Sequence, residues 1–120
     1  MYKKKINIGI LGCSNIAKSS IIPTLREMKE FNVIGVASRT KKKADVFSQE
    51  FKLKSFNSYE SILEEALIDA VYIPLPNSLH YQWAKKALEK KINVLVEKSM
   101  ACEFQEVVEL NNLARDNALV

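Results

Sequence analysis

The chain has 120 residues, of which 48% are hydrophobic and 27% are charged, and its formal net charge is +4. This length and composition are typical of one soluble globular domain, and they exclude an intrinsically disordered chain and a membrane-spanning one. Because the lysines are interleaved with 14 acidic residues and not with stacking aromatics, we expect no nucleic-acid partner, and we also expect no membrane partner. Two cysteines far apart in the sequence favour reduced thiols and a cytoplasmic location.

Strand-like and helix-like stretches alternate along the chain. A basic opening leads into an apolar stretch that is too short for a signal peptide, so residues 6–11 are predicted as a first strand. A helical stretch begins near Asn15, and Pro23 fits the first residue of a restarted helix. A second strand at 33–37, a lysine-rich helix at 41–51 and a brief strand at 54–56 follow.

The second half continues the alternation. Ser58 is a candidate cap for a helix with apolar residues at 62, 63, 66 and 67. Strands are expected at 70–73 and 93–96, with one helix over 78–90 between them and a last helix from about Glu103. The inward positions expected for these two helices are Leu79, Trp83, Ala84, Ala87 and Leu88, and then Phe104, Val107, Val108 and Leu113 or Ala114.

The order of these elements indicates the fold class. Short apolar strands that each precede a helix favour an α/β fold of the Rossmann type, a doubly wound parallel sheet covered on both faces. Residues 1–120 form one domain, without repeats or a low-complexity linker. Cys13, Cys102 and the single histidine lack metal-type spacing, so no metal site is predicted. Ligands of such sheets bind beyond the carboxyl ends of the strands.

The turn after the first strand reads GCSNIA, from Gly12 to Ala17. A nucleotide-binding turn needs a tight bend and then room for a pyrophosphate beside backbone N–H groups. Gly12 supplies the bend, Ser14 stands where a second glycine is usual, and Ala17 still permits close packing of helix on strand. An ordinary strand–helix turn is the alternative, but the position in a βαβ unit favours nucleotide binding.

The second strand ends in ASRT. An acid about 20 positions after the glycine turn would hold the ribose of NAD, and Ser38 and Arg39 stand there instead. A guanidinium pairs with a 2′-phosphate that a carboxylate would repel, so we predict that NADP(H) is preferred over NAD(H). The alternative is that Arg39 is a solvated loop arginine. The missing acid also argues against an S-adenosylmethionine methyltransferase.

Two further segments follow the fourth and fifth strands. In PLPNSLH, two prolines stiffen the loop, Asn77 or Ser78 is a candidate helix cap, and His80 is either structural or faces the crevice. In VLVEKSMA, Lys98 is either a surface lysine or a group that donates to a substrate oxygen and transfers a proton. Glu97 is either its partner or a buried structural acid.

With these segments in this order, the chain resembles the glucose–fructose oxidoreductase/inositol dehydrogenase (Gfo/Idh/MocA) family. The segments VYIPLPNSLHYQWAKKAL (71–88) and VLVEKSMA (94–101) look like the family's D-x-V-x-I-x-x-P-N-x-x-H stretch and its E-K-P motif. The likeness covers almost the whole chain but only the nucleotide-binding half of the family's two-domain plan.

The resemblance implies roles for the matching positions. Lys98 corresponds to the catalytic lysine that assists proton transfer and orients the substrate. The implied cofactor-binding residues are Gly12, Ser14, Asn15 and Ile16 at the pyrophosphate, Ser38 and Arg39 at the adenosine phosphate, Pro76, Asn77 and His80 near the nicotinamide ribose, and Glu97 beside the nicotinamide. Ser99 replaces the proline that follows the motif lysine, which puts the aim of Lys98 in doubt.

The resemblance also implies a parent enzyme that moves hydride between NADP(H) and a carbinol or ketone carbon of a small-molecule sugar. Family members continue into a second α/β domain, which holds a proton-transferring histidine, most substrate contacts and an open sheet used to form homo-oligomers; this chain has no counterpart. We therefore expect the NADP-binding domain of a sugar oxidoreductase, which turns over no sugar by itself. The alternative is a stand-alone nucleotide-binding or interaction module, which Ser14 and Ser99 would favour.

Overall fold

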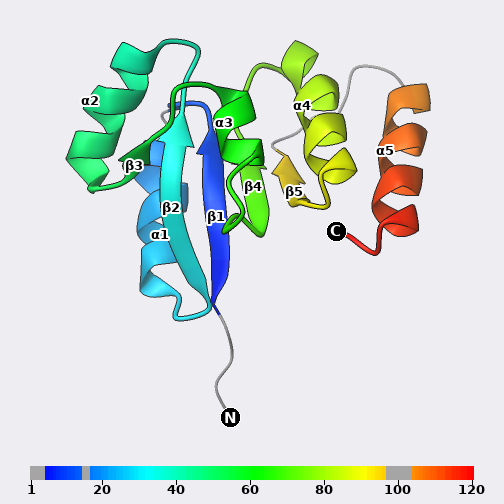
Figure 1. Ribbon diagram of the computed structural model, residues 1–120, viewed down its shortest axis with the longest axis horizontal. Helices are drawn as coiled ribbons and strands as arrows, with labels where there is room; N and C mark the ends of the chain where they lie inside the picture. Colours follow the sequence, from blue (N-terminus) through cyan, green and yellow to red (C-terminus); the bar gives the residue numbers. More distant parts are fainter. Residues whose placement is uncertain (1–4, 15–16, 97–103) are drawn as a thin grey trace.

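The computed structural model describes residues 5–14, 17–96 and 104–120. These residues form one sheet with helices around it (Figure 1). The strands are β1 (Ile6–Leu11), β2 (Phe31–Ala37), β3 (Lys54–Ser55), β4 (Ala70–Ile73) and β5 (Asn93–Val96). The helices are a π-helical turn (Ala17–Ile21), α1 (Ile22–Glu27), α2 (Lys41–Phe51), α3 (Tyr59–Leu63), α4 (Asn77–Glu89) and α5 (Phe104–Asp116).

All strand pairs of the sheet are parallel, and their order is β3-β2-β1-β4-β5. Within β1, Gly9 pairs with Gly35 of β2 on one side and with Val71 of β4 on the other. Strands β2 and β3 therefore lie on one side of β1, and strands β4 and β5 lie on the other. The gap between β1 and β4 is the switch point at which doubly wound sheets bind their ligands.

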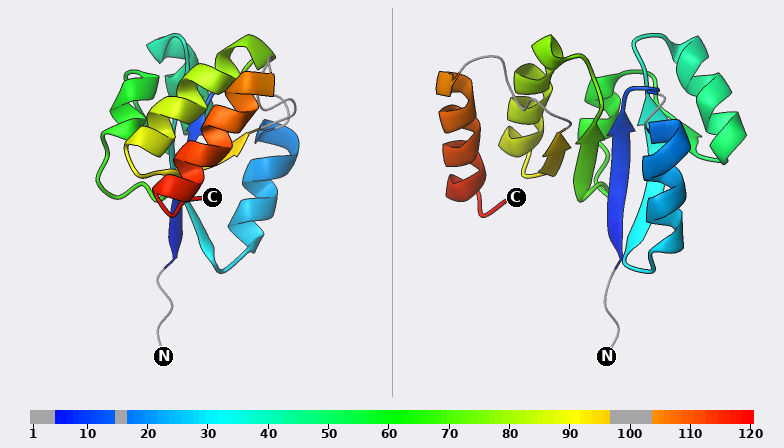
Figure 2. Two further views of the ribbon diagram at one scale, coloured as in Figure 1. Left: turned by 90° about the vertical axis from the view of Figure 1, so that its right-hand side faces the viewer. Right: turned by 180° about the vertical axis from the view of Figure 1, so that it is seen from behind.

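Helices cover both faces of the sheet, and each face has its own core. Figure 1 shows α3 in front of the sheet and α1 behind it, and the rear view in Figure 2 shows α1 in front. Ile8 and Ile10 of β1 pack with Ile22 of α1 and Phe47 of α2. The opposite core contains Ile62 of α3 together with residues of α4 and α5, including Trp83, Leu88 and Leu110. The predicted Rossmann-type doubly wound sheet is confirmed.

Most predicted bounds agree with the structure, because strong turn residues mark them. The strands at 6–11, 70–73 and 93–96 and the helix at 41–51 have the bounds expected, and Pro23 lies in the first turn of α1. Ser58 caps α3, since its Oγ accepts a hydrogen bond from the backbone N of Ser61 at 3.2 Å. The second strand begins earlier than predicted, at Phe31.

Three expectations about the helices were wrong. The helix after Ser58 ends at Leu63, so that Leu67 is 61% exposed and Ile68 is buried instead. Phe104 is 81% exposed, and Leu110 is the buried position of α5. Helical spacing identifies the inward face of a helix, but it does not say how far the neighbouring element extends along that face.

None of the helices in the described part is long and apolar enough to span a membrane.

The third error concerns the start of α4. Pro76, and not Asn77 or Ser78, is its N-cap residue, and Asn77 is its first helical residue. The backbone of Pro76 is extended, with φ −55° and ψ 148°, and this φ lies within the range that the proline ring fixes.

Candidate functional site

The turn after β1 bends at Gly12, whose φ is +122°. Its N–H donates to the carbonyl of Ala37 at 2.9 Å, which ties the end of β1 to the end of β2. Residues with a side chain rarely adopt this φ, and a Cβ at Gly12 would lie 3.0 Å from Cδ2 of Leu75. The tight bend expected from the sequence therefore depends on glycine.

Ser14 and Ala17 complete this turn. The Oγ of Ser14 accepts a hydrogen bond from the backbone N of Ala17 at 3.0 Å, in the manner of a helix N-cap. Since the oxygen acts as acceptor here, the hydroxyl keeps its hydrogen for donation to an anion. Ala17 is fully buried against Ile8 and Ile10, which is the close packing of helix on strand that was expected. Asn15 and Ile16 lie outside the described residues, and their role stays a prediction.

The end of β2 brings a second group of polar side chains to the same edge of the sheet. Ser38 is 7% exposed, whereas Arg39 is exposed. Thr40 caps α2, because its side chain accepts a hydrogen bond from the backbone N of Lys43 at 3.3 Å. This cap fixes the first turn of α2 beside the end of β2.

Cys13 lies among these residues. Burial raises the pKa of its thiol, and a hydrogen bond with Ser38 and the positive charge of Lys43 oppose that rise. The thiol is therefore protonated at neutral pH, and it adds no negative charge that would repel an anionic ligand.

The loop between β4 and α4 forms the opposite side of the edge. His80 is 1% exposed, and its Nε2 forms a short hydrogen bond with the backbone carbonyl of Leu75. The backbone N of Leu79 donates to the carbonyl of Pro76 at 2.9 Å. His80 thus fixes the loop from inside, and whether it also contacts a cofactor stays a prediction. Asn77 begins α4, but its side chain is not among the described ones.

The segment after β5 held the predicted catalytic residue. β5 ends at Val96, which pairs with Ile73 at the end of β4. Glu97, Lys98 and Ser99 lie outside the described residues. The proton-transfer role of Lys98 and the place of Glu97 beside a nicotinamide stay predictions.

A cavity of about 250 Å³ joins the strand ends at the switch point. Its lining residues are Cys13, Ser14, Ser38, Arg39, Lys43, Tyr59, Pro74, Leu75, Pro76 and Leu79. Four predicted site residues, Ser14, Ser38, Arg39 and Pro76, are thus brought together, and a Cβ at Gly12 would meet Leu75 of the same cavity. The cavity has cationic and hydroxyl groups from three segments and apolar surface from the loop after β4.

Two polar residues of this cavity, Lys43 and Tyr59, lie outside the segments that the sequence singled out as ligand-binding. Lys43 was seen only as part of a lysine-rich helix, and Tyr59 was not considered. The signal for Lys43 was the N-cap at Thr40, which turns the first residues of α2 toward the end of β2. The signal for Tyr59 was the cap residue Ser58, which fixes the start of α3, but the place of its ring also depends on how α3 packs against α4.

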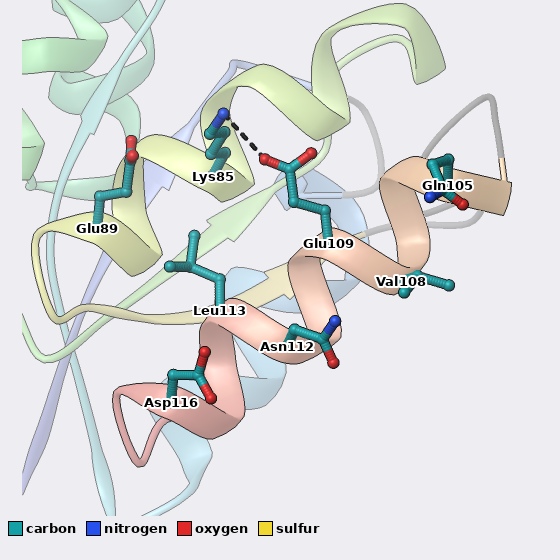
Figure 3. A pocket seen from close by; sticks show the side chains of 8 residues that line it. All are labelled: Lys85, Glu89, Gln105, Val108, Glu109, Asn112, Leu113 and Asp116. Atoms are coloured by element: carbon teal, nitrogen blue, oxygen red, sulfur yellow. Dashed lines mark ion pairs between the residues drawn. The ribbon is translucent and has the colours of Figure 1, made fainter.

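A larger cavity, of about 590 Å³, lies between α4 and α5, but it does not suit a phosphate ligand. Figure 3 shows the ion pair that spans it, between Lys85 and Glu109 at 2.9 Å. Glu89 and Asp116 add two further carboxylates to its lining. The excess of negative charge would repel an anion, and the cavity lies between helices rather than at the strand ends. The described residues also contain no group of three side chains that could hold a metal ion.

Comparisons with known proteins agree with this geometry. The family model described as "Oxidoreductase family, NAD-binding Rossmann fold" (Gfo/Idh/MocA) matches residues 6–120. A dTDP-3,4-didehydro-2,6-dideoxy-alpha-D-glucose 3-reductase from Saccharopolyspora spinosa is 37% identical over 118 residues, which are 98% of this chain and 36% of that protein. A D-xylose 1-dehydrogenase (NADP(+)) from Haloferax volcanii is 34% identical over 109 residues, 90% of this chain and 33% of that protein.

A solved structure gives the same result. The 3-ketoreductase of Actinomadura kijaniata, in complex with TDP-benzene and NADP, superposes with a TM-score of 0.93 at 32% identity, over 98% of this chain and 37% of that one. The chain thus spans about a third of the length of the relatives it matches. It belongs to the Gfo/Idh/MocA oxidoreductase family and has that family's NAD-binding Rossmann fold.

Proposed function

We propose that this chain binds NADP(H), in preference to NAD(H), as the dinucleotide-binding domain of a sugar oxidoreductase. The observation that carries the proposal is the joint presence of Arg39, Lys43 and Ser14 around one cavity at the switch point of the sheet. None of the described residues lining that cavity carries a carboxylate. Two cations and no acid suit a 2′-phosphate better than a free ribose hydroxyl pair.

The lysines after Arg39 differ in their availability to a ligand. Lys41 forms an ion pair with Asp45 at 2.8 Å and donates a hydrogen bond to the Oγ of Ser55 at 2.8 Å. These two contacts hold the Lys41 side chain beside β3. Lys43 lines the cavity instead. We therefore assign Lys43, with Arg39, to the phosphate.

The backbone at Gly12 also suits the cofactor. Because Gly12 has no side chain, the chain bends tightly here without a clash against Leu75, and a nucleotide-binding turn requires such a tight bend. The hydroxyl of Ser14 would donate to a phosphate oxygen. The bound cofactor supplies the hydride chemistry. In the whole protein, Lys98 would hold the proton of the substrate hydroxyl.

The wider function rests on the relatives. They include reductases of dTDP-linked keto-sugars and an NADP-dependent xylose dehydrogenase, so a small-molecule sugar is the substrate class that we propose for the whole protein. Because this chain spans about a third of such proteins, we expect it to bind NADP(H) without reducing a sugar. Steady-state reduction of a keto-sugar by the chain alone would contradict this expectation.

Parallel titration with NADPH and NADH tests the proposal. Binding should quench or shift the fluorescence of the single tryptophan, Trp83, whose ring centroid lies 5.0 Å from that of Tyr59 in the cavity wall. We expect NADPH to bind about tenfold more tightly than NADH, the scale of one charge-assisted contact. Equal affinity would remove Arg39 and Lys43 from the phosphate role, and absence of binding by both would overturn the proposal.

A further inference from the structure

Tyr59 is the one aromatic side chain among the described residues that line the switch-point cavity. It is the first residue of α3, directly after the cap residue Ser58, and it is half-buried. The cap fixes the start of the helix and therefore the position from which the side chain of Tyr59 leaves the backbone.

Trp83 of α4 holds the ring of Tyr59 in place. The two ring centroids lie 5.0 Å apart with an interplanar angle of 73°, an edge-to-face contact. Trp83 is itself 6% exposed within the core, and Lys86 Nζ lies 4.5 Å from the centroid of its ring. Since its neighbour is rigidly packed, the ring of Tyr59 loses little freedom when a ligand packs against it.

The surroundings of the Tyr59 hydroxyl place it near the charged part of the cavity. Burial raises the pKa of Tyr59, the Cys13 thiol acts in the same direction, and the Arg39 charge opposes both. The phenol is therefore neutral at physiological pH. An aromatic ring thus stands close to a guanidinium that suits a phosphate, with Leu75 and Leu79 adding apolar surface to the same cavity.

We propose that Tyr59 recognises the base of the bound nucleotide, with its ring packed against the purine while Arg39 and Lys43 hold the phosphate. This inference rests on the proposed function, since it presupposes that a nucleotide occupies the cavity. A purine presents an apolar π-face of the kind that an aromatic ring and two leucines would cover. The flat ring and the phosphate of one ligand would then satisfy two chemically different parts of one cavity.

Calorimetric titration with two ligands tests the inference on the 120-residue chain. One ligand is 2′,5′-ADP, and the other is ribose 2,5-bisphosphate, which has the same phosphates without the base. We expect Tyr59→Ala to weaken binding of 2′,5′-ADP about tenfold and to leave the base-free ligand within about twofold, as loss of a base–aromatic contact predicts. Tyr59→Phe keeps the ring and should leave both affinities within about twofold.

Controls separate this inference from the function beneath it. Arg39→Ala should weaken both ligands, because both carry the phosphates. If Tyr59→Ala does not fold, Tyr59→Leu keeps apolar bulk against Trp83 and should show the same selective loss. Equal loss of both ligands, or no loss of 2′,5′-ADP, would overturn the role of Tyr59 alone. Failure of the parent chain to bind either ligand would overturn the proposed function as well.

Discussion

Replacement of Gly12 by alanine tests whether the turn after β1 depends on backbone geometry. An alanine at φ +122° has a strained conformation that costs about 1–3 kcal/mol. Its Cβ would also lie 3.0 Å from Cδ2 of Leu75, which must shift by a few tenths of an ångström at a cost of about 1 kcal/mol. The lower entropy of the unfolded chain returns about 0.5–1 kcal/mol. We therefore expect Gly12→Ala to destabilise the domain by about 2 kcal/mol.

Urea denaturation followed by circular dichroism measures this loss, and a second variant separates its two causes. Leu75→Val removes the δ carbons that the new Cβ would meet. In that background Gly12→Ala should cost about 0.5–1 kcal/mol less, because only the backbone strain remains. A cost below about 0.5 kcal/mol for Gly12→Ala in the parent chain would refute the reasoning from φ.

Three further predictions concern binding, thiol chemistry and capping. Arg39→Ala should weaken the binding of NADPH about tenfold and leave the binding of NADH unchanged. The control is Lys29→Ala, which removes a positive charge just before β2, at the opposite end of the strand, and should change neither affinity. An equal loss of affinity for both cofactors would contradict a phosphate role for Arg39. In a Cys102→Ser background, alkylation of Cys13 measured by mass spectrometry should be slow at neutral pH and accelerate at alkaline pH, because burial raises the pKa of this thiol. NADPH should slow the same reaction. Ser58→Ala should lower the free energy of unfolding by about 1 kcal/mol through loss of the α3 cap, and an unchanged urea midpoint would argue against that cap.

The fold was largely predictable, because residues with strong local preferences mark its boundaries. Gly12 follows β1, Thr40 precedes α2 and Pro74 follows β4, and each is a residue type that favours the end or the start of an element. The errors arose where a boundary depends on tertiary contacts. Phe104 has the helical spacing of an inward residue, but its side chain is exposed. The periodicity of a helix shows which face is apolar, and it does not show how far the surface that covers this face extends.

The candidate site was predictable to the extent that topology alone determines it. A parallel sheet brings all strand carboxyl ends to one edge, so Ser14, Ser38, Arg39 and Pro76 were expected to meet, and they line one cavity. Lys43 and Tyr59 reach the same cavity from helices, whose rotation and packing are set by Thr40 and Trp83. His80 had two interpretations, and its burial against the Leu75 carbonyl shows how it supports the loop.

The proposed cofactor preference and the proposed sugar chemistry depend on different residues of this chain. Arg39 and Lys43, the cations that we propose for a 2′-phosphate, lie just after β2 and in the first turn of α2, and both line the switch-point cavity. Lys98 comes after β5 in the sequence, and the role that we propose for it requires a sugar substrate. A binding contact acts on the free energy of the cofactor complex whether or not a substrate is present. Preference for NADP(H) over NAD(H) is therefore a property that this chain should express by itself, independently of the sugar and of Ser99.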